Sequence, residues 1–348
     1  MSHRHAERDL TRYSRQVLCA QVGEEGQRRL KHAQLVLIGC GALGSMLANL
    51  LVRAGIGALR IIDRDFIELK NLQRQMLFDE RDISENMPKA EAAARTLRRV
   101  NSGVEIDAVV DDVNPGNIER HCENVELILD GTDNLETRYL INDVAVKHDL
   151  PWVYGACIRE TGLVMAILPG QTPCLRCVWD EPPPPGSIET CDTVGVLGAA
   201  AAMVASLQAT EAMKTLLGRT TELIGLASID VWTGRSRTLN VQAAHEVGQC
   251  PCCDQRRFDF LEGDRLAATS TLCGRDAIQV VPSEPVELDL KRLALRLPGH
   301  THARHSSFML KFHVDALDVT LFQDGRAIVQ GTTDPAVARG VVAKYVGV

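Results

Sequence analysis

Residues 38–44, with the sequence IGCGALG, constrain the fold of this chain more than any other stretch. Gly39, Gly41 and Gly44 fit the G-x-G-x-x-G pattern between the apolar run QLVLI and the helix-like segment SMLANLLVRAG. Glycine lets the chain turn tightly and brings backbone N–H groups close to a phosphate, and the helix start adds partial positive charge. The stretch therefore predicts a strand, a turn and a helix that hold a nucleotide.

The run LRIIDRD reads as a second buried strand ending in Asp63, roughly twenty residues after the glycine turn. A carboxylate at this place usually holds ribose hydroxyls. The glycine motif by itself also fits a nicotinamide or flavin enzyme, or a tight turn that binds nothing. It predicts a nucleotide without saying which one.

Strand-like and helix-like segments alternate between residues 34 and 158, which predicts an α/β fold. We expect a Rossmann-like, mostly parallel sheet with helices on both faces. The expected strands are 34–39, 59–65, 104–112, 125–133 and 151–158, and the expected helices are 45–55, 89–101 and 136–149. Ligands of such sheets lie beyond the carboxyl ends of the strands, where Asp63, Asp65 and Asp133 fall.

The pattern changes after residue 160, where antiparallel strands are expected. Residues 162–170 look like a strand that leads away from the sheet core, and the proline-rich stretch 181–190 predicts a mobile loop or crossover. A long helix is expected over 195–218 and an antiparallel hairpin over 228–241.

A composition break around residues 261–270 predicts a domain boundary between 1–262 and 263–348. The second segment reads as strand, helix, three strands and a final helix, which is a small α+β domain.

Charge and cysteine content bound the surroundings of the chain. The net charge of −7 over 348 residues argues against a nucleic-acid partner. The N-terminus lacks an apolar leader, and the longest apolar run soon meets Gln208, Glu211 and Lys214, which argues against a membrane span. Eleven cysteines without a leader favour a reducing, cytoplasmic location.

Two CxxC pairs form the most specific chemical signal. Cys174 and Cys177 lie in CLRC, and Cys250 and Cys253 lie in CPCC. Four thiolates make a closed tetrahedral zinc site without an open position, so we expect a structural zinc. Four unrelated thiols or a redox pair would be the alternative, and Cys252 is a possible substitute for Cys253.

Charged and amide side chains gather around the expected nucleotide. NLQRQ, residues 71–75, includes Arg74; Lys89 begins a helix after a proline; Asp133 and Asn134 follow a strand. Cations neutralise charge on phosphates and a carboxylate can hold Mg²⁺, so this set suits triphosphate chemistry better than hydride transfer. Solvated surface charge is the alternative.

Two weaker signals remain. Cys191, in ETCDTVG, lies where a helix approaches, and it is either an exposed nucleophile or an inert thiol. His300, His302 and His305 can be read as metal ligands, but a solvated loop is the better interpretation.

Over about residues 10–255, this chain resembles the ThiF/MoeB/HesA group. The resemblance is carried, in chain order, by the motifs RYSRQ, GCGALG, DRD, NLQRQ, MPKAE, GTDN, CLRC, TC and CPCC. Members of this group are ubiquitin-activating-type adenylyltransferases of bacteria that act on sulfur-carrier proteins for thiamin and molybdopterin synthesis. The resemblance implies an adenylation domain over 1–262, with a nucleotide-binding half at about 10–160 and a zinc- and carrier-binding half at about 161–262.

The resemblance also implies the chemistry and its partners. A ubiquitin-like carrier offers its C-terminal Gly-Gly carboxylate to the α-phosphate of MgATP, and pyrophosphate leaves. Residues expected at the ATP are Gly39, Gly41, Ala42, Gly44, Asp63, Asp65, Asn71, Arg74, Gln75, Lys89, Asp133 and Asn134. Arg74, Lys89 and Asp133 are the expected catalytic groups, and Asp133 would coordinate Mg²⁺ or align the α-phosphate. Arg15 would reach the partner subunit's ATP, which implies a homodimer.

Cys191 matches a family position that is linked covalently to the carrier or a persulfide in some members and is not needed in others, so any thiol role is expected after adenylation. A cysteine desulfurase or another sulfur donor is then a further candidate partner. Ala42 stands where a glycine is common, and MPK replaces GQPK. An NAD-dependent oxidoreductase and a scaffold without catalysis remain as alternatives, and the carrier itself stays open.

Overall fold

The computed structural model describes residues 10–183, 191–246, 248–262, 277–281, 287–298, 301–306, 308–314 and 316–346. The chain divides into two compact units, one up to Asp264 and one from Arg265.

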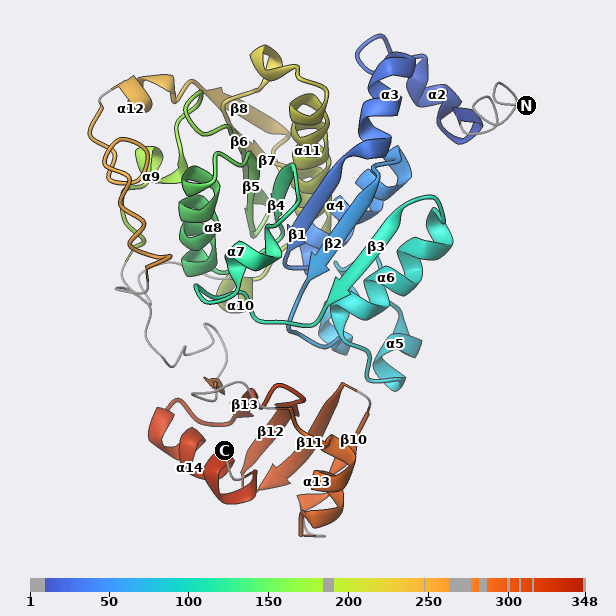
Figure 1. The fold of residues 1–348 in the computed structure, drawn as a ribbon, viewed down its shortest axis with the longest axis vertical. Coiled ribbons are helices and arrows are strands. Elements are labelled where there is room, and N and C mark those ends of the chain that lie inside the picture. Colours follow the sequence, from blue (N-terminus) through green and yellow to red (C-terminus); the bar gives the residue numbers. More distant parts are fainter. Residues whose placement is uncertain are drawn as a thin grey trace. The chain divides into compact units, whose positions relative to one another are not determined.

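The first unit is built on an eight-stranded sheet in the order β3-β2-β1-β4-β5-β6-β7-β8 (Figure 1). Its strands are β1 Gln34–Ile38, β2 Ala58–Ile62, β3 Glu105–Val109, β4 Leu127–Asp130, β5 Trp152–Ile158, β6 Thr161–Ile167, β7 Leu226–Asp230 and β8 Arg235–Leu239. β1 to β5 pair in parallel, and β5 to β8 pair antiparallel. The expected Rossmann-like sheet with antiparallel strands toward its C-terminal side is confirmed.

Helices cover both faces of this sheet (Figure 1). They are α2 Ser14–Val17, α3 Gly23–His32, α4 Ala42–Ala54, α5 Glu80–Ser84, α6 Lys89–Val100, α7 Ile118–His121, α8 Leu135–Lys147, α9 Leu175–Val178, α10 Cys191–Val194, α11 Gly198–Leu216 and α12 Gln242–Glu246, with short 3-10 turns at Thr11–Tyr13 (η1), Leu69–Asn71 (η2) and Thr220–Glu222 (η3). The helices α4, α6 and α11 pack on one face, and α7 and α8 pack on the other.

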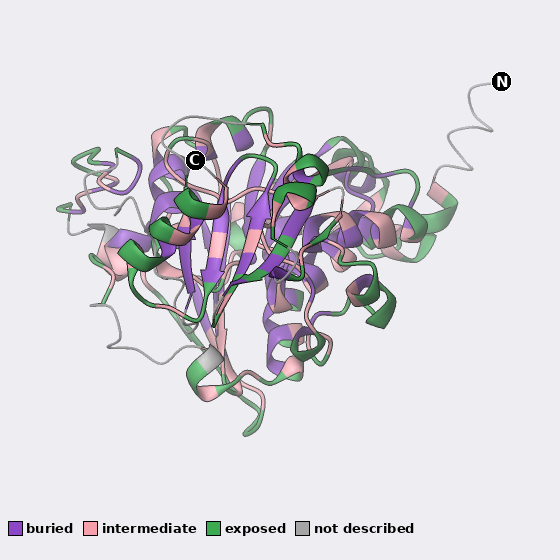
Figure 2. Cartoon of the chain, turned by 90° about the horizontal axis from the view of Figure 1, so that it is seen from below, coloured by how far each residue is buried: buried purple, intermediate pink, exposed green. Residues whose placement is uncertain are grey.

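Burial follows from the apolar runs of the central strands. All four residues of β4 are buried, as are four of the five in β1, because helices cover both faces there (Figure 2). Leu35 and Leu37 join the cluster under α4, whereas Val36 and Ile38 join the cluster under α8. Every residue of β8 is exposed, as befits a strand at the sheet edge.

The expectation that residues 162–170 lead away from the sheet core is wrong. β6 pairs antiparallel with β5 from Ile158↔Thr161 to Trp152↔Ile167, and five of its seven residues are buried. Its apolar side chains extend the same core, because α11 packs across it. Residues 184–190, which hold most of the proline-rich stretch, lie outside the described residues.

The second unit is an antiparallel sheet in the order β10-β11-β12-β13-β9 with two helices. Its elements are β9 Ala277–Val280, α13 Leu290–Arg296, β10 Arg304–His305, β11 Met309–Val314, β12 Leu317–Phe322, β13 Ala327–Gln330 and α14 Pro335–Tyr345. Leu310, Phe312 and Val319 pack with Ala338 and Val342 of α14 in its core. The expected α+β architecture is confirmed, with the short β10 as an additional strand.

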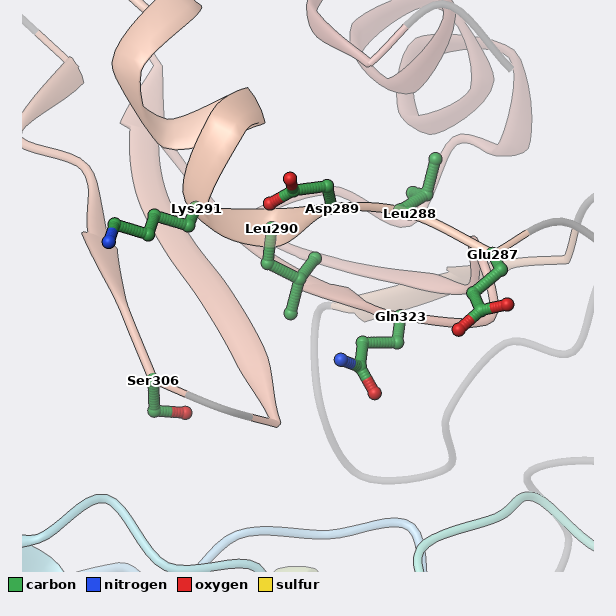
Figure 3. Close-up of a pocket in the computed structure, with 7 residues that line it drawn as sticks. All are labelled: Glu287, Leu288, Asp289, Leu290, Lys291, Ser306 and Gln323. Atoms are coloured by element: carbon green, nitrogen blue, oxygen red, sulfur yellow. The ribbon is translucent and has the colours of Figure 1, made fainter.

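One hollow of about 400 Å³ lies in this second unit, around the start of α13 (Figure 3). Its lining residues are Glu287, Leu288, Asp289, Leu290, Lys291, Ser306 and Gln323. Acidic, basic, amide and apolar groups are mixed, so the lining favours no class of ligand.

Among the helices in the described segments, none combines the length and the apolarity needed to cross a lipid bilayer.

Candidate nucleotide site and metal centre

Three of the predicted segments meet at one edge of the first unit's sheet. β1, β2 and β4 run parallel, with Ile38 opposite both Ile62 and Asp130, so the loops that follow them emerge side by side. These loops are the glycine turn 39–44, the acidic segment 63–65 and the segment 131–134. The structure therefore brings together most of the residues that the sequence predicted for a nucleotide.

The glycines of the turn serve different purposes. Gly39 has φ +85°, and an added Cβ would lie 2.8 Å from the backbone of Gly131. A Cβ on Gly44 would lie 2.0 Å from the Gly39 carbonyl oxygen. A Cβ on Gly41 would meet only the Gln75 amide, at 3.8 Å. Gly39 and Gly44 thus permit close packing, whereas Gly41 leaves the backbone open to a ligand, and Ala42 begins α4 without needing glycine's freedom.

Asp63 fastens the end of β2 to this turn. Its Oδ2 accepts the Cys40 N–H at 2.6 Å and its Oδ1 accepts the Asp65 N–H at 2.7 Å. Burial raises the pKa of the Asp63 carboxyl, against the lowering effect of the nearby Lys89 charge. The carboxylate is therefore placed where a ribose is expected, and it also shapes the turn.

Lys89 is a buried cation paired with Asp65. Its Nζ lies 2.8 Å from Asp65 Oδ2, and its side chain is 6% exposed. Burial disfavours the ammonium form, but the Asp65 and Asp63 carboxylates outweigh burial and raise the Lys89 pKa. Lys89 therefore stays positively charged at neutral pH.

Arg64 is a cation of this edge that the sequence analysis did not single out. Its Nη1 lies 2.6 Å from Asp112 Oδ1, after β3, and its Nε lies 4.0 Å from Asp65 Oδ1. Burial disfavours the charged forms of Arg64 and Lys89, but carboxylates that include the exposed Asp133 raise both pKa values. Its position inside DRD was the one available signal.

The segment NLQRQ packs beside the glycine turn. Asn71 is buried, and its Oδ1 accepts the Glu68 N–H at 2.8 Å, so its side chain shapes the local turn. Arg74 is partly exposed, and its Nη1 donates to the Lys70 carbonyl at 2.9 Å. Gln75 is 4% exposed, and its buried Oε1 has no hydrogen-bond partner. An unpartnered amide oxygen beside Gly41 fits a site that gains a ligand.

The loop with Asp133 rests on a buried ion pair that the sequence analysis also missed. Arg138 Nε lies 3.0 Å from Asp130 Oδ2, and Nη2 donates to the carbonyls of Thr132 at 2.7 Å and Gly155 at 2.9 Å. The side chain of Asn134 accepts the Glu136 N–H and so caps α8.

Arg15 lies apart from this edge within the chain. It is exposed on α2, next to η1, whose Tyr13 packs against Gly55 at the far end of α4. The 13 residues of α4 span roughly 20 Å. Within one chain, the structure does not bring Arg15 to the glycine turn.

Cys191 lies near the carboxyl end of β5. Its thiol donates to the Cys157 carbonyl at 3.2 Å, and its side chain is partly buried. His302 and His305 belong to the second unit, and neither joins a cluster of metal-donor side chains in the described segments. His300 lies outside the described residues.

The four expected cysteines gather into one cluster that could hold a metal ion. All sulfur atoms of Cys174, Cys177, Cys250 and Cys253 lie within 4.8 Å of one another. The Sγ–Sγ separations are 3.7 Å for Cys174–Cys250, 3.9 Å for Cys174–Cys177 and 3.2 Å for Cys177–Cys253. Tetrahedral zinc with 2.3 Å bonds separates its sulfurs by about 3.8 Å, so the cluster fits this ion.

Comparisons with known proteins agree with this architecture. The family model described as "ThiF family" matches residues 13–252. The sulfur carrier protein ThiS adenylyltransferase of Bacillus subtilis (strain 168) is 42% identical over 339 residues, which cover 97% of this chain and 99% of that protein. The sulfur carrier protein adenylyltransferase of Thermus thermophilus is 38% identical over 256 residues, 72% of this chain and 93% of that protein.

Two further likenesses extend the comparison. The adenylyltransferase and sulfurtransferase MOCS3 of Xenopus laevis is 35% identical over 246 residues, which are 70% of this chain but only 54% of that protein. E. coli MccB, solved with ATP, superimposes with a TM-score of 0.58 at 23% identity, over 67% of this chain and 72% of MccB. The likeness to MccB shows a shared fold.

Proposed function

This chain belongs to the ThiF family, and from that membership we propose that it adenylates the C-terminal glycine carboxylate of a small ubiquitin-like sulfur-carrier protein, with release of pyrophosphate. It is an adenylyltransferase that activates the carrier for sulfur transfer in thiamin, molybdopterin or related biosynthesis. The observation that carries this function is the 42% identity with a ThiS adenylyltransferase along 97% of the chain.

The adenosine half of ATP lies on the glycine turn, with Asp63 at the ribose. The open backbone at Gly41 and the unpartnered Oε1 of Gln75 support this placement, since both are satisfied by a ligand there. The helix α4 begins at Ala42, and the partial positive charge of its N-terminus is directed toward the phosphates. Asn71 and Asn134 shape the flanking loops.

Arg74 and Lys89 bind the phosphates and neutralise the charge that builds on them. Lys89 exchanges its contact with Asp65 for one with ATP, and it remains charged because carboxylates still surround it. The carrier's carboxylate oxygen forms a bond to the α-phosphorus while the bond to pyrophosphate breaks. The attacking group is already ionised, so positioning and charge neutralisation suffice without a general base.

Asp133 is the residue that would hold Mg²⁺, and its exposed carboxylate is the type of donor that this ion prefers. When bound, Mg²⁺ offsets negative charge on the phosphates. Asp130 and Arg138 act beneath this loop, because their ion pair fixes the backbone on which Asp133 stands.

The active assembly is a homodimer in which Arg15 completes the ATP site of the neighbouring subunit. The distance of Arg15 from its own glycine turn supports a contact in trans.

Cys191 acts after adenylation, on sulfur from a cysteine desulfurase or another donor, at the same edge as the nucleotide. The reducing cytoplasm suits a chain that depends on so many cysteines.

Zinc in the four-cysteine centre is structural. Cys174 and Cys177 precede α11, and Cys250 and Cys253 follow β8, so the ion joins two segments that flank the antiparallel half of the sheet. Residues 1–262 form the adenylation domain, and residues 263–348 form an accessory domain.

Exchange of radiolabelled pyrophosphate into ATP tests the function. We expect exchange that requires Mg²⁺ and a carrier with a free C-terminal Gly-Gly. A carrier whose C-terminus is amidated should support none. Undiminished exchange with Arg74→Ala would favour a different site, and reduction of NAD⁺ in place of exchange would favour the oxidoreductase.

A further inference from the structure

The helix α8 carries two adjacent polar residues that are fully buried. Asn142 and Asp143 are both 0% exposed. Burying an amide and a carboxyl group is unfavourable unless each finds hydrogen-bond partners. Their partners lie around the two CxxC pairs, which raises the question of what these side chains do for the metal centre.

Asn142 holds the first pair through both ends of its amide. Its Oδ1 accepts the N–H of Leu175, the residue after Cys174, at 2.8 Å. Because that N–H can only donate, it fixes the amide orientation and turns Nδ2 toward sulfur. Nδ2 lies 3.3 Å from Cys252 Sγ and 3.6 Å from Cys174 Sγ.

Asp143 holds the segment that follows the second pair. Its Oδ2 accepts the N–H groups of Phe260 at 2.8 Å and Leu261 at 3.3 Å. Its Oδ1 lies 3.5 Å from Cys252 Sγ, whose thiol donates to it. The Cys252 sulfur is thus enclosed between the two α8 side chains and lies outside the group of four sulfurs.

We propose that Asn142 is a positioning residue of the metal centre, which orients the Cys174 thiolate by an N–H···S hydrogen bond and, with Asp143, keeps Cys252 from replacing a ligand. The proposal rests on zinc occupying the four-cysteine site. An N–H donor stabilises the negative sulfur in the direction that the ion requires. Loss of such an outer hydrogen bond typically weakens metal affinity about 10- to 100-fold.

Asn142→Asp is the sharpest variant. Aspartate has the size of asparagine and keeps an oxygen for the Leu175 N–H, but it turns a second oxygen toward the Cys174 thiolate. Asn101→Asp is the matched control, because Asn101 is 2% exposed and its Nδ2 donates to Tyr13 Oη and the Val52 carbonyl, each at 2.8 Å. Neither of these hydrogen-bond partners is a metal ligand.

Zinc release from the full chain to a chromogenic chelator is the first measurement. We expect Asn142→Asp to release zinc about 10- to 100-fold faster than wild type, and Asn101→Asp to match wild type. Equal release by the two aspartate variants would overturn the proposal, because the effect would then reflect any buried amide. A wild-type chain that retains no zinc would instead reject the proposed metal.

Cobalt substitution gives a second, spectroscopic measurement that does not depend on folding energy alone. In Asn142→Ala, which adds no charge, the sulfur-to-cobalt charge-transfer band should move to lower energy, since the thiolate loses a hydrogen bond. Cys252→Ala should keep the wild-type band intensity. An unshifted band in Asn142→Ala, or an intensity loss of about one thiolate in four in Cys252→Ala, would overturn the proposal.

Discussion

At the level of single residues, Lys89 combines burial with full charge. Its pairing with Asp65 keeps a cation at the proposed nucleotide site. Asp63 and Arg64 lie next to this pair. Positive and negative side chains therefore alternate at this edge of the sheet, and the charge of each one influences its neighbours.

Lys89→Met removes this charge while keeping much of the side chain's volume. We expect ATP–pyrophosphate exchange to fall at least about 100-fold, since one preorganised charge contact is typically worth that much. Lys70→Met is the control, because the Lys70 side chain is exposed and its Nζ lies 2.9 Å from Glu68 Oε2. Exchange within tenfold of wild type in Lys89→Met would contradict the proposed role.

Cys191→Ala separates the two halves of the proposed reaction. We expect this variant to exchange pyrophosphate within about twofold of wild type, because adenylation needs no thiol. Formation of the carrier thiocarboxylate should be lost, as followed by carrier mass. Loss of exchange would place Cys191 in the adenylation step instead, and an unchanged thiocarboxylate yield would remove it from both steps.

At the level of elements, α8 connects the two chemical centres. It begins at the Asn134 cap beside Asp133, and its middle carries the two residues that hold the CxxC pairs. A helix with a polar, buried interior turn is stable here because every such group has a partner.

The buried Asp143 predicts a pH effect on stability. Burial raises the pKa of its carboxyl from 3.8 to about 6, against the lowering effect of its hydrogen bonds. The folded chain therefore binds this proton more tightly than the unfolded chain. The contribution of this bound proton to the free energy of unfolding is complete below about pH 4 and is lost as the pH rises through about 6. The total contribution is roughly 3 kcal/mol.

Asp143→Asn removes this titration. Between pH 4 and pH 7 the melting temperature of the variant should rise relative to wild type by roughly 5–10 °C, as measured by circular dichroism. A difference that stays constant over this pH range would contradict the prediction.

At the level of the whole molecule, the proposed dimer explains why Arg15 is distant from its own site. Arg15→Ala and Lys89→Met should each lack exchange activity alone. When the two variants are mixed and their subunits are allowed to dissociate and reassociate, the mixture should recover about a quarter of the wild-type activity. Random pairing makes half of the dimers mixed, and one of the two sites in each mixed dimer is intact. Failure to recover activity when the subunits do exchange would exclude a site completed in trans.

The second unit should be dispensable for adenylation. The Thermus thermophilus relative matches 72% of this chain yet 93% of its own length, so little of it remains to supply such a unit. A chain ending at residue 262 should therefore exchange pyrophosphate within about threefold of the full chain, because its core is separate. A folded truncation without activity would show that the second unit contributes to the site.

Spacing along the chain was sufficient wherever the chemistry is local. The glycine spacing predicted the turn, since Gly39 and Gly44 must approach other backbone closely. The two CxxC pairs predicted the cluster, since each pair needs only one turn of chain to present two sulfurs. Alternation predicted the parallel sheet, and parallel strands place their following loops together.

Tertiary structure decided the features that depend on residues far apart in sequence. Arg64 and Arg138 became part of the edge only when β2, β3, β4 and β5 were aligned. Cys252 and Cys253 are neighbours in sequence, and their different environments arise because α8, more than a hundred residues earlier, places Asn142 and Asp143 against one of them. The sequence by itself determined which chemical groups are present and how neighbouring ones are spaced. Packing alone determined which distant group each one faces, because contacts across the fold depend on how whole elements bury their apolar faces together.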